Sequence, residues 1–473
     1  MNTRSAPAPA DPAARRDVEA GPIQVGLLGI GTVGRGTFEV LRRNQDEIRR
    51  RAGRGIAITM VADLDAARAR AIVGDHARVV ADAREVIANP AIEIVVELIG
   101  GYGIARQLVL EAIAAGKHVV TANKALLAVH GTEIFQAARD QGVIVAFEAA
   151  VAGGIPIIKA LREGLTANRI GWIAGIINGT TNFILSEMRS KGLDFATALA
   201  QAQALGYAEA DPTFDIEGVD AAHKATIMSA IAFGVPMQFD RAHVEGIAAL
   251  QAADIRYAEQ LGYRIKLLGI TKRRDDLRSA ANPAGGIELR VHPTLIPATR
   301  LIANVEGAMN AVVVHGDAVG TTLYYGKGAG AEPTASAVIA DLVDITRLAS
   351  ADPDHRVPHL AFQPGELQDT PILPIDEVVT SFYLRLQVAD EKGVLARITG
   401  ILADNDISID AVLQRPGTEG DGLGAPAAGE GKTDLIILTH DTVEGRMNAA
   451  LAQMQALPTV LAPIVRIRKE ELN

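Results

Sequence analysis

A glycine-rich turn near the start of the chain constrains the fold more than any other feature. It reads Gly29-Ile30-Gly31-Thr32-Val33-Gly34 and directly follows an apolar stretch at residues 23–28. A long helical pattern of apolar residues follows, reaching Ile48. A strand, a glycine turn and a helix in this order are typical of the first unit of a dinucleotide-binding domain. The sequence therefore predicts an α/β chain that begins with a Rossmann-type domain.

Each glycine of this turn has a predicted task. Gly29 is expected to make the tight turn, Gly31 to let the backbone approach a pyrophosphate, and Gly34 to let the helix pack closely on the strand. Thr32 and Val33 lie between them and complete the predicted cofactor-binding set in this turn.

The second strand, residues 56–62, bears on the choice of cofactor because it ends at Asp63. A carboxylate there accepts from the ribose of NAD and repels the extra phosphate of NADP. Arg68 and Arg70 follow closely and offer a partner for that phosphate instead, or simply form a solvated helix face. The residues leave NAD and NADP open, and Arg68 is a candidate cofactor residue.

Strand and helix patterns continue to alternate up to residue 150. Strands are predicted at 94–99 and 143–147, with a helix at 104–115 between them. Another strand ends at Thr121 and leaves Lys124 at the edge where open α/β sheets bind ligands. A lysine that opens a helix is usually only solvated, so Lys124 is a site candidate with a simple alternative. Residues 23–150 are predicted to form the NAD(P)-binding domain.

The stretch 206–224 gathers the strongest candidates for chemistry. Pro212 predicts a turn, and from Val219 onward apolar residues recur at helical spacing. On that helix Asp220 and Lys224 stand four residues apart and share a face. The plain alternative is a solvated ion pair worth a few tenths of a kcal/mol.

Residues 151–348 are predicted to form an α+β substrate-binding, catalytic and dimerisation domain with a mixed sheet. Strands are expected at 169–177, 287–291 and 311–314. The polar segment 178–182 begins a helix and suits either a substrate pocket or simple capping. Glu209 and Asp215 are expected on the loop before the Asp220 helix, which would place anions opposite an ammonium group. A helix is predicted at 336–348, and the chain is expected to return to the first domain near 305–348.

The last part of the chain predicts a separate small domain. Residues 349–376 are rich in proline and lack periodicity, so they are predicted to be a linker. Residues 377–473 follow the order β-α-β-β-α-β of a ferredoxin-like fold, with the last strand expected at 460–466. The glycine-rich insert 417–432 is expected to be disordered and to lengthen the middle hairpin.

Composition excludes several classes of function. A chain of 473 residues is too long for one core, and its net charge of −10 argues against nucleic acid and anionic membranes as partners. There are no cysteines, which excludes disulfides, thiolate metal sites and cysteine nucleophiles. Residues 1–22 resemble a disordered tail rather than a signal peptide, and no apolar run is long enough to cross a membrane. The sequence therefore predicts a cytoplasmic protein with small-molecule partners.

Five motifs in order resemble those of homoserine dehydrogenase. They lie at 29–34, 121–124, 178–182, 206–224 and 326–334. The resemblance spans about residues 23–470 and implies NAD(P)-dependent interconversion of L-aspartate 4-semialdehyde and L-homoserine, in the path to threonine and methionine. It favours NADP. Aspartate semialdehyde dehydrogenase, which handles the same aldehyde through a thiol, is excluded because the chain lacks cysteine.

The resemblance also implies roles for individual residues. Lys224 would donate the proton, Asp220 would orient it and contact the substrate, and Glu209 would pair with the substrate ammonium, with Asp215 in support. Lys124 would contact the cofactor or support Lys224. Cofactor contacts are further implied for three glycines, namely Gly206, Gly328 and Gly330. A monovalent cation, sodium or potassium, is implied at the loop after the last strand of the first domain, through Glu148, Val151, Gly153 and Ile155; a tight interdomain hinge without an ion is the alternative.

For the C-terminal region the resemblance implies an ACT domain, a module that binds amino acids at paired interfaces. Threonine is the implied effector, and a homodimer or homotetramer is the implied assembly. Two other functions stay open: an amino-acid sensor whose dehydrogenase half has lapsed, and a different amino-acid-type NAD(P) reductase on the same scaffold.

Overall fold

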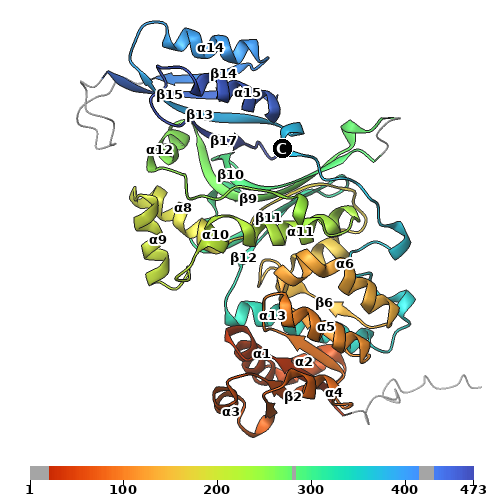
Figure 1. Ribbon diagram of the computed structural model, residues 1–473. Coiled ribbons are helices and arrows are strands. Elements are labelled where there is room, and N and C mark those ends of the chain that lie inside the picture. Colours follow the sequence, from red (N-terminus) through yellow and green to blue (C-terminus); the bar gives the residue numbers. More distant parts are fainter. Residues whose placement is uncertain (1–20, 280–283, 415–430) are drawn as a thin grey trace, which may run out of the picture.

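The computed structural model describes residues 21–279, 284–414 and 431–473 (Figure 1). Residues 1–20 of the predicted tail and residues 417–430 of the predicted insert lie outside these residues. In Figure 1 the N-terminal sheet, the central sheet and the C-terminal module follow one another along the long axis of the molecule. The described helices include none that is both long and apolar enough to span a bilayer.

The N-terminal layer is a parallel sheet of six strands in the order β3-β2-β1-β4-β5-β6. This is the doubly wound order in which the direction of winding reverses between β1 and β4. The strands are mostly buried on both faces, which explains their nearly continuous apolar sequences. Their bounds are β1 (Ile23–Leu28), β2 (Ile56–Ala62), β3 (Arg78–Val80), β4 (Ile94–Glu97), β5 (His118–Thr121) and β6 (Val145–Ala146).

Helices cover both faces of this sheet. Helix α13 comes from far along the chain, packs beside α1, and shares with it the apolar cluster under the first strands. The ion pair of Arg43 with Glu332, at 2.7 Å between Nη1 and Oε1, joins the same helices at the surface. The helix bounds are α1 (Thr32–Arg43), α2 (Gln45–Ala52), α3 (Ala66–Val73), α4 (Ala83–Ala88), α5 (Gly103–Ala114), α6 (Lys124–Asp140) and α13 (Ala331–Leu348).

Two details of this layer differ from the sequence prediction. The long first helix is two helices, because the chain bends at Asn44, where α1 ends and α2 begins. The strand expected at 94–99 ends at Glu97. The buried carboxylate of Glu97 accepts from the backbone N–H groups of Ile99 and Gly100 at 2.8 and 3.0 Å, and this turns the chain out of the sheet.

The central and C-terminal parts share one eleven-stranded mixed sheet. Its main order is β12-β11-β7-β9-β10-β17-β13-β15-β14, with β8 on β10 and β16 on β13. The strands of the central part are β7 (Ile170–Ile176), β8 (His243–Val244), β9 (Tyr263–Arg274), β10 (Gly286–Pro297), β11 (Met309–Gly316) and β12 (Gly320–Lys327). The helices beside them are α7 (Ile157–Lys159), α8 (Gly179–Lys191), α9 (Phe195–Ala204), α10 (Thr213–Ile216), α11 (Val219–Phe233) and α12 (Ala252–Gln260).

The sequence missed three strands of the central part. β8 and β9 were not predicted, and β12 includes residues 325–327, which the resemblance to homoserine dehydrogenase places in a glycine-rich loop at 325–330. Asp215 was expected on a loop and lies in the short helix α10. The mixed sheet with covering helices is confirmed.

The C-terminal module has the predicted ferredoxin-like order of elements. These are β13 (Val379–Ala389), α14 (Val394–Asp404), β14 (Ile409–Gln414), β15 (Lys432–Thr439), β16 (Thr442–Val443), α15 (Glu444–Gln455) and β17 (Val465–Lys469). The last strand begins five residues later than expected. Pro463 precedes it and has no backbone N–H to donate to a ladder.

Candidate active site

A buried ammonium group lies at the centre of the candidate site. Lys224 is on α11, and its Nζ donates to Asp220 Oδ2 at 2.7 Å and to the carbonyl of Ile177 at 2.7 Å. The side chains of Lys224 and Asp220 are 11% and 5% exposed, so this is not a solvated surface pair. An ammonium has three donors. Among the described residues two of them are engaged, which leaves one N–H for a substrate oxygen.

Asn178 connects Asp220 with a second carboxylate. Its Nδ2 donates to Asp220 Oδ2 at 2.8 Å and to Asp215 Oδ1 at 2.7 Å. Its Oδ1 accepts from the backbone N–H of Thr181 at 2.8 Å and so caps α8. The sequence identified this segment as a pocket or a cap, and the side chain of Asn178 is placed to serve both purposes. It was not named as a site residue.

Lys124 links the two halves of the site. It opens α6 at the carboxyl edge of the N-terminal sheet, and its Nζ lies 3.1 Å from Asp220 Oδ1. The carboxylate of Asp220 therefore lies between two ammonium groups, one from α6 beside the N-terminal sheet and one from α11 beside the mixed sheet. Of the two roles expected for Lys124, this contact supports the one in which it assists Lys224.

The charges of the site shift one another's protonation equilibria. Burial lowers the pKa of Lys224, Asp220 raises it, and Lys124 lowers it further; the result is a pKa below that of free lysine. Burial raises the pKa of Asp220, but the charges of Lys224 and Lys124 outweigh it and hold that pKa below its usual range. Burial and the neighbouring charge of Asp220 raise the pKa of Asp215. One firmly ionised carboxylate thus accompanies an ammonium that releases its proton more easily than usual.

The remaining predicted substrate residue is more exposed. Glu209 lies between α9 and α10, and its carbonyl accepts from Gln203 Nε2 at 3.0 Å. In the described part of the chain its carboxylate has no ion-pair partner. Gly206 lies three residues earlier with a left-handed φ of 75°, at the exposed end of α9.

The glycine turn has the geometry that its predicted tasks require. Gly29 has a φ of 91°, which other residues rarely adopt. A Cβ on Gly34 would lie 2.2 Å from the carbonyl oxygen of Gly29, so only glycine fits there. A Cβ on Gly31 would meet no described atom within 4 Å, and the space beside it is open. Thr32 and Val33 form the first turn of α1 next to this space.

The residues that bear on cofactor choice are in contact with one another. Asp63 Oδ2 accepts from the backbone N–H of Ile30 at 2.8 Å and lies 3.4 Å from Arg68 Nη2. Arg68 is 53% exposed. The arginine therefore lies at the edge of the glycine turn with its guanidinium accessible.

The glycine-rich segment 326–330 closely approaches residues 148–156, the loop that follows β6. We call residues 148–156 the exit loop. A Cβ on Gly153 would lie 2.4 Å from the carbonyl oxygen of Gly328, and Gly154 donates its N–H to the carbonyl of Lys327 at 3.0 Å. Gly330 has a φ of 124° and precedes α13. Gly328 and Gly330 thus lie where the chain returns to the N-terminal layer.

The exit loop has some features of a monovalent-cation site. The left-handed φ values of Ala152 (56°) and Gly153 (49°) turn the loop sharply. The carboxylate of Glu148 already accepts from two backbone N–H groups, and burial raises its pKa to about 7. In the described part of the chain the carbonyls of Val151 and Gly153 accept no hydrogen bond, which fits a hard cation. No cluster of three or more His, Asp or Glu side chains suited to a metal occurs among the described residues.

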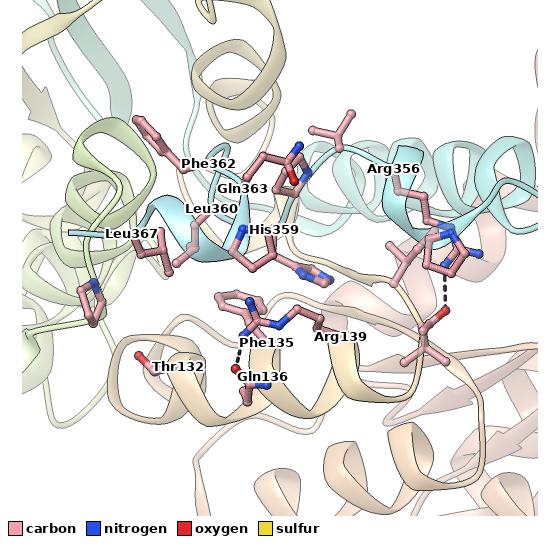
Figure 2. A pocket seen from close by; sticks show the side chains of 18 residues that line it. Thr132, Phe135, Gln136, Arg139, Arg356, His359, Leu360, Phe362, Gln363 and Leu367 are labelled. Carbon is pink, nitrogen blue, oxygen red and sulfur yellow. Dashed lines mark hydrogen bonds between the residues drawn. The ribbon is translucent and has the colours of Figure 1, made fainter. Parts of the chain in front are cut away.

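A pocket of about 360 Å³ lies elsewhere, between α6 and the segment 353–367 (Figure 2). The ring of His359 stacks on Phe135 there at 5.2 Å, and Arg356 is held by backbone carbonyls that include that of Gly142, at 2.8 Å. None of the predicted site residues lines this pocket. The predicted linker is therefore packed against α6 along this stretch.

Three family models match successive regions of the chain. The family model described as homoserine dehydrogenase, NAD binding domain, matches residues 29–148, and the one described as homoserine dehydrogenase matches 156–343. A model of the ACT domain matches 382–458. Homoserine dehydrogenases of Pseudomonas aeruginosa and Neisseria gonorrhoeae are 59% and 57% identical, each over 96% of this chain, covering 100% and 99% of their own lengths.

Solved structures agree with these matches. The crystal structure of a homoserine dehydrogenase from Thiobacillus denitrificans is 62% identical, with a TM-score of 0.88, and the match covers 96% of this chain and 99% of that one. A hyperthermophilic archaeal homoserine dehydrogenase mutant in complex with NADPH is 25% identical, with a TM-score of 0.57, over 69% of this chain and 98% of that one.

An oxidoreductase that acts on a CH–OH group with NAD(P) is the class of enzyme that the fold and these matches define. The three matched regions together cover most of the chain. The chain belongs to the homoserine dehydrogenase family and has an ACT domain in its C-terminal part. It catalyses that family's NAD(P)-dependent interconversion of L-aspartate 4-semialdehyde and L-homoserine.

Proposed function

We propose that Lys224 is the proton donor when the protein reduces L-aspartate 4-semialdehyde to L-homoserine. The chemistry that a bound reduced nicotinamide would supply is the transfer of a hydride to the aldehyde carbon. The third N–H of the Lys224 ammonium stabilises the negative charge that develops on the carbonyl oxygen and then transfers its proton. In the oxidation of homoserine the neutral amine accepts that proton.

The observation that carries this proposal is the chain of contacts Lys124–Asp220–Lys224. It ties the proton donor to the carboxyl edge of the dinucleotide-binding sheet, which is where open α/β sheets bind their ligands. Asp220 orients both lysines. A carboxylate has about four lone-pair positions, so Asp220 also retains capacity to contact the substrate.

The substrate's own charges are matched by the loop before α11. We assign Glu209 to the substrate ammonium, because its carboxylate is exposed and without an ion-pair partner in the described part of the chain. Asp215 supports the same side of the site through Asn178. Selection of an amino acid over a plain hydroxy acid follows, since the hydroxy acid would leave the carboxylate of Glu209 without its partner.

For the cofactor we propose NADP, with NAD as the alternative. Gly29, Gly31, Thr32, Val33 and Gly34 hold the pyrophosphate. Arg68 leaves Asp63 to pair with the 2′-phosphate, as its exposed guanidinium allows. The archaeal relative that binds NADPH supports this choice. Lys124, Gly206, Gly328 and Gly330 complete the predicted cofactor contacts.

Three further parts of the proposal concern the rest of the chain. A sodium or potassium ion would be held mainly by the carbonyls of Val151 and Gly153, with Glu148 and Ile155 beside them, and would stiffen the exit loop. Domain boundaries are placed at 23–150, 151–348 and 377–473, with the linker at 349–376. The ACT domain would bind threonine in a cytoplasmic homodimer or homotetramer.

The first experiment adds homoserine and each cofactor in turn to the purified protein and follows nicotinamide absorbance. Reduction of NADP⁺ or NAD⁺ that depends on homoserine supports the proposal. Absence of turnover with homoserine, together with binding of an amino acid, would favour a sensor instead. Turnover with a different amino alcohol and not with homoserine would favour another reductase.

A further inference from the structure

The ACT domain and the catalytic part are joined through one short stretch of parallel sheet. Strand β17 pairs with β10 at Arg468 with Thr294 and at Lys469 with Leu295. The backbone N–H of Glu470 then donates to the carbonyl of Leu295 at 3.0 Å. Few backbone hydrogen bonds therefore hold this junction. The surrounding side chains must contribute much of what fixes the position of the ACT domain relative to the catalytic part.

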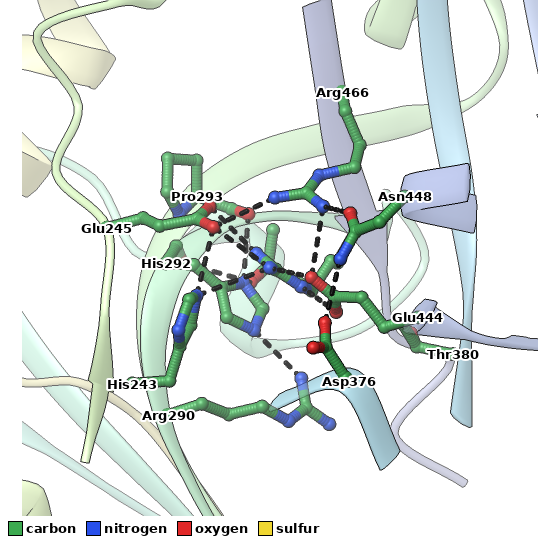
Figure 3. Close-up of polar contacts among 12 residues, drawn as sticks. His243, Glu245, Arg290, His292, Pro293, Asp376, Thr380, Glu444, Asn448 and Arg466 are labelled. Atoms are coloured by element: carbon green, nitrogen blue, oxygen red, sulfur yellow. Dashed lines mark hydrogen bonds and ion pairs between the residues drawn. The ribbon is translucent and has the colours of Figure 1, made fainter. Parts of the chain in front are cut away.

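A cluster of charged side chains covers the junction (Figure 3). Glu245, from the catalytic part, accepts from Arg466 Nη2 at 2.9 Å and from Arg468 Nη1 at 2.8 Å. Arg468 is 1% exposed, and on its other side Nε donates to Glu444 of α15 at 2.7 Å. His243 lies 2.9 Å from the same Glu245 carboxylate. Glu245 is thus held by two arginines of the ACT domain.

Glu245 belongs to a short segment, residues 243–247, which we call the strap. Its backbone is fixed on one side by the N–H of Glu245, which donates to the carbonyl of Val291 at 2.8 Å. On the other side the N–H of Ile247 donates to the carbonyl of Ile216 at 2.8 Å. A Cβ on Gly246 would lie 2.4 Å from the carbonyl oxygen of Ile216, so the strap packs directly against the end of α10.

Helix α10 carries the next link to the active site. Asp215 lies one residue before Ile216 and accepts from Asn178 Nδ2 at 2.7 Å. The same amide donates to Asp220, which holds Lys224. The strap also touches the start of α11, because a Cβ on Gly218 would lie 3.2 Å from Val244 and 3.4 Å from the carbonyl oxygen of Glu245.

We propose that Glu245 is a positioning residue for the substrate site. Its contacts with Arg466 and Arg468 transmit the position of the ACT domain, through the strap and α10, to Asp215 and the groups that receive homoserine. This inference rests on the substrate site proposed above. A shift of β17 relative to β10 would then change the affinity for homoserine before it changes the affinity for the dinucleotide.

A second ion pair across the same two parts of the chain provides a matched control. Arg385 of β13 donates through Nε to Asp254 of α12 at 2.6 Å, and both side chains are buried. Neither residue belongs to the strap or contacts it. Loss of this pair weakens the junction without displacing α10.

The experiment compares three variants of the full chain: Glu245→Gln, Gly246→Ala and Arg385→Gln. Glu245→Gln removes the charge that the arginines hold, and Gly246→Ala leaves all charges in place but pushes the strap away from Ile216. Both are expected to raise KM for homoserine about tenfold, the effect of misplacing one charge-assisted contact, with KM for the cofactor unchanged. Arg385→Gln is expected to lower Tm and leave both KM values as in the wild type.

The proposal is overturned if Glu245→Gln or Gly246→Ala folds normally and keeps the wild-type KM for homoserine. It is also overturned if either variant raises KM for homoserine and for the cofactor alike. The same holds if Arg385→Gln raises KM for homoserine alone, because either result would mean that the protein has lost rigidity in general and not that the strap has moved. Should Glu245→Gln fail to fold, Gly246→Ala decides. Absence of homoserine turnover in the wild type would refute the proposed function instead and is seen before any variant is made.

Discussion

Asn178 shows what residue spacing can and cannot predict. The pairing of Asp220 with Lys224 follows from helix geometry, since residues four apart share a face, and the spacing predicted it. The bridge from Asn178 to Asp215 and Asp220 spans 37 and 42 residues, and no local pattern encodes it. The polar segment 178–182 was the available signal, and it indicated a cap as readily as a bridge. Likewise, the contact of Lys124 with Asp220 depends on two sheets coming together.

At the same scale, the protonation of Lys224 predicts how the rate of homoserine oxidation depends on pH. Oxidation of homoserine needs the neutral amine, and burial lowers the pKa of Lys224 from that of free lysine, about 10.4. The kcat/KM for homoserine should therefore rise with pH to a midpoint below that value, whereas reduction of the aldehyde, which needs the ammonium, should slow. A profile that stays flat between about pH 6 and pH 10 would contradict this assignment.

Arg68 provides a test of cofactor choice. Arg68→Ala removes the group proposed to meet the 2′-phosphate, and a hydrogen bond to a charged group is worth about 1.5–3 kcal/mol. KM for NADP⁺ should rise about 10- to 100-fold while KM for NAD⁺ changes little. The variant Arg70→Ala, on the same helix, serves as the control. An equal rise of KM for NADP⁺ and for NAD⁺ in Arg68→Ala would show that this arginine does not bind the 2′-phosphate.

At the scale of elements, the sequence predicted the buried strands β1 and β2 well, but it missed the edge strand β12 and also β9, which is largely buried between β7 and β10. β1 and β2 were predicted with their observed bounds, because both faces are largely buried and each strand is apolar except for one residue, Gln24 in β1 and Thr59 in β2. β12 alternates between half-buried and exposed positions at the end of the sheet and has a glycine near each of its ends, Gly320 and Gly326, so its sequence resembles a loop. Helix α10 is a single turn, which is too short to produce a periodic signal.

Two glycines of the dinucleotide turn should respond differently to the same substitution. In Gly34→Ala the new Cβ would lie 2.2 Å from the Gly29 carbonyl oxygen, so both Tm and cofactor affinity should fall. In Gly31→Ala the Cβ meets no described atom within 4 Å, so Tm should stay near that of the wild type while KM for the cofactor rises about tenfold or more. Thermal unfolding and cofactor titration of both variants check this. A Gly31→Ala protein with normal cofactor affinity would contradict the assigned task of the turn.

At the scale of the whole molecule, the C-terminal module is less separate than the sequence indicated. The linker composition at 349–376 predicted an independent domain, but β17 joins the catalytic sheet through β10, and residue 359 packs on α6. Pairing between strands more than 150 residues apart leaves no trace in local periodicity. Deleting the ACT domain would remove strands from a continuous sheet, so threonine inhibition is better tested in the full chain.

One buried histidine, His223, and two half-buried ones, His118 and His359, predict how the stability of the whole protein depends on pH. Burial lowers the pKa of His118 and of His223 to about 4, and burial together with nearby arginines lowers that of His359 to about 3. Below about pH 6.5 the unfolded chain binds protons at these positions that the folded chain does not, so stability falls as pH falls. Glu148, whose pKa burial raises to about 7, contributes with the opposite sign between about pH 7 and pH 5. The histidine contribution is therefore measured as a difference: Tm should fall more between about pH 7 and pH 5 in the wild type than in His118→Asn, and an equal fall in both would contradict the lowered pKa of His118.

The role of Lys224 is tested most directly by the turnover of Lys224→Ala with homoserine. The variant should bind NADP⁺ as the wild type does and show a kcat about 10²- to 10⁴-fold lower, the usual loss for a missing proton donor. Lys191→Ala is the matched control, because Lys191 forms an i,i+4 pair with Glu187 on a helix but is 55% exposed; it should keep full activity. Wild-type turnover by Lys224→Ala would contradict the assignment of Lys224 as the proton donor.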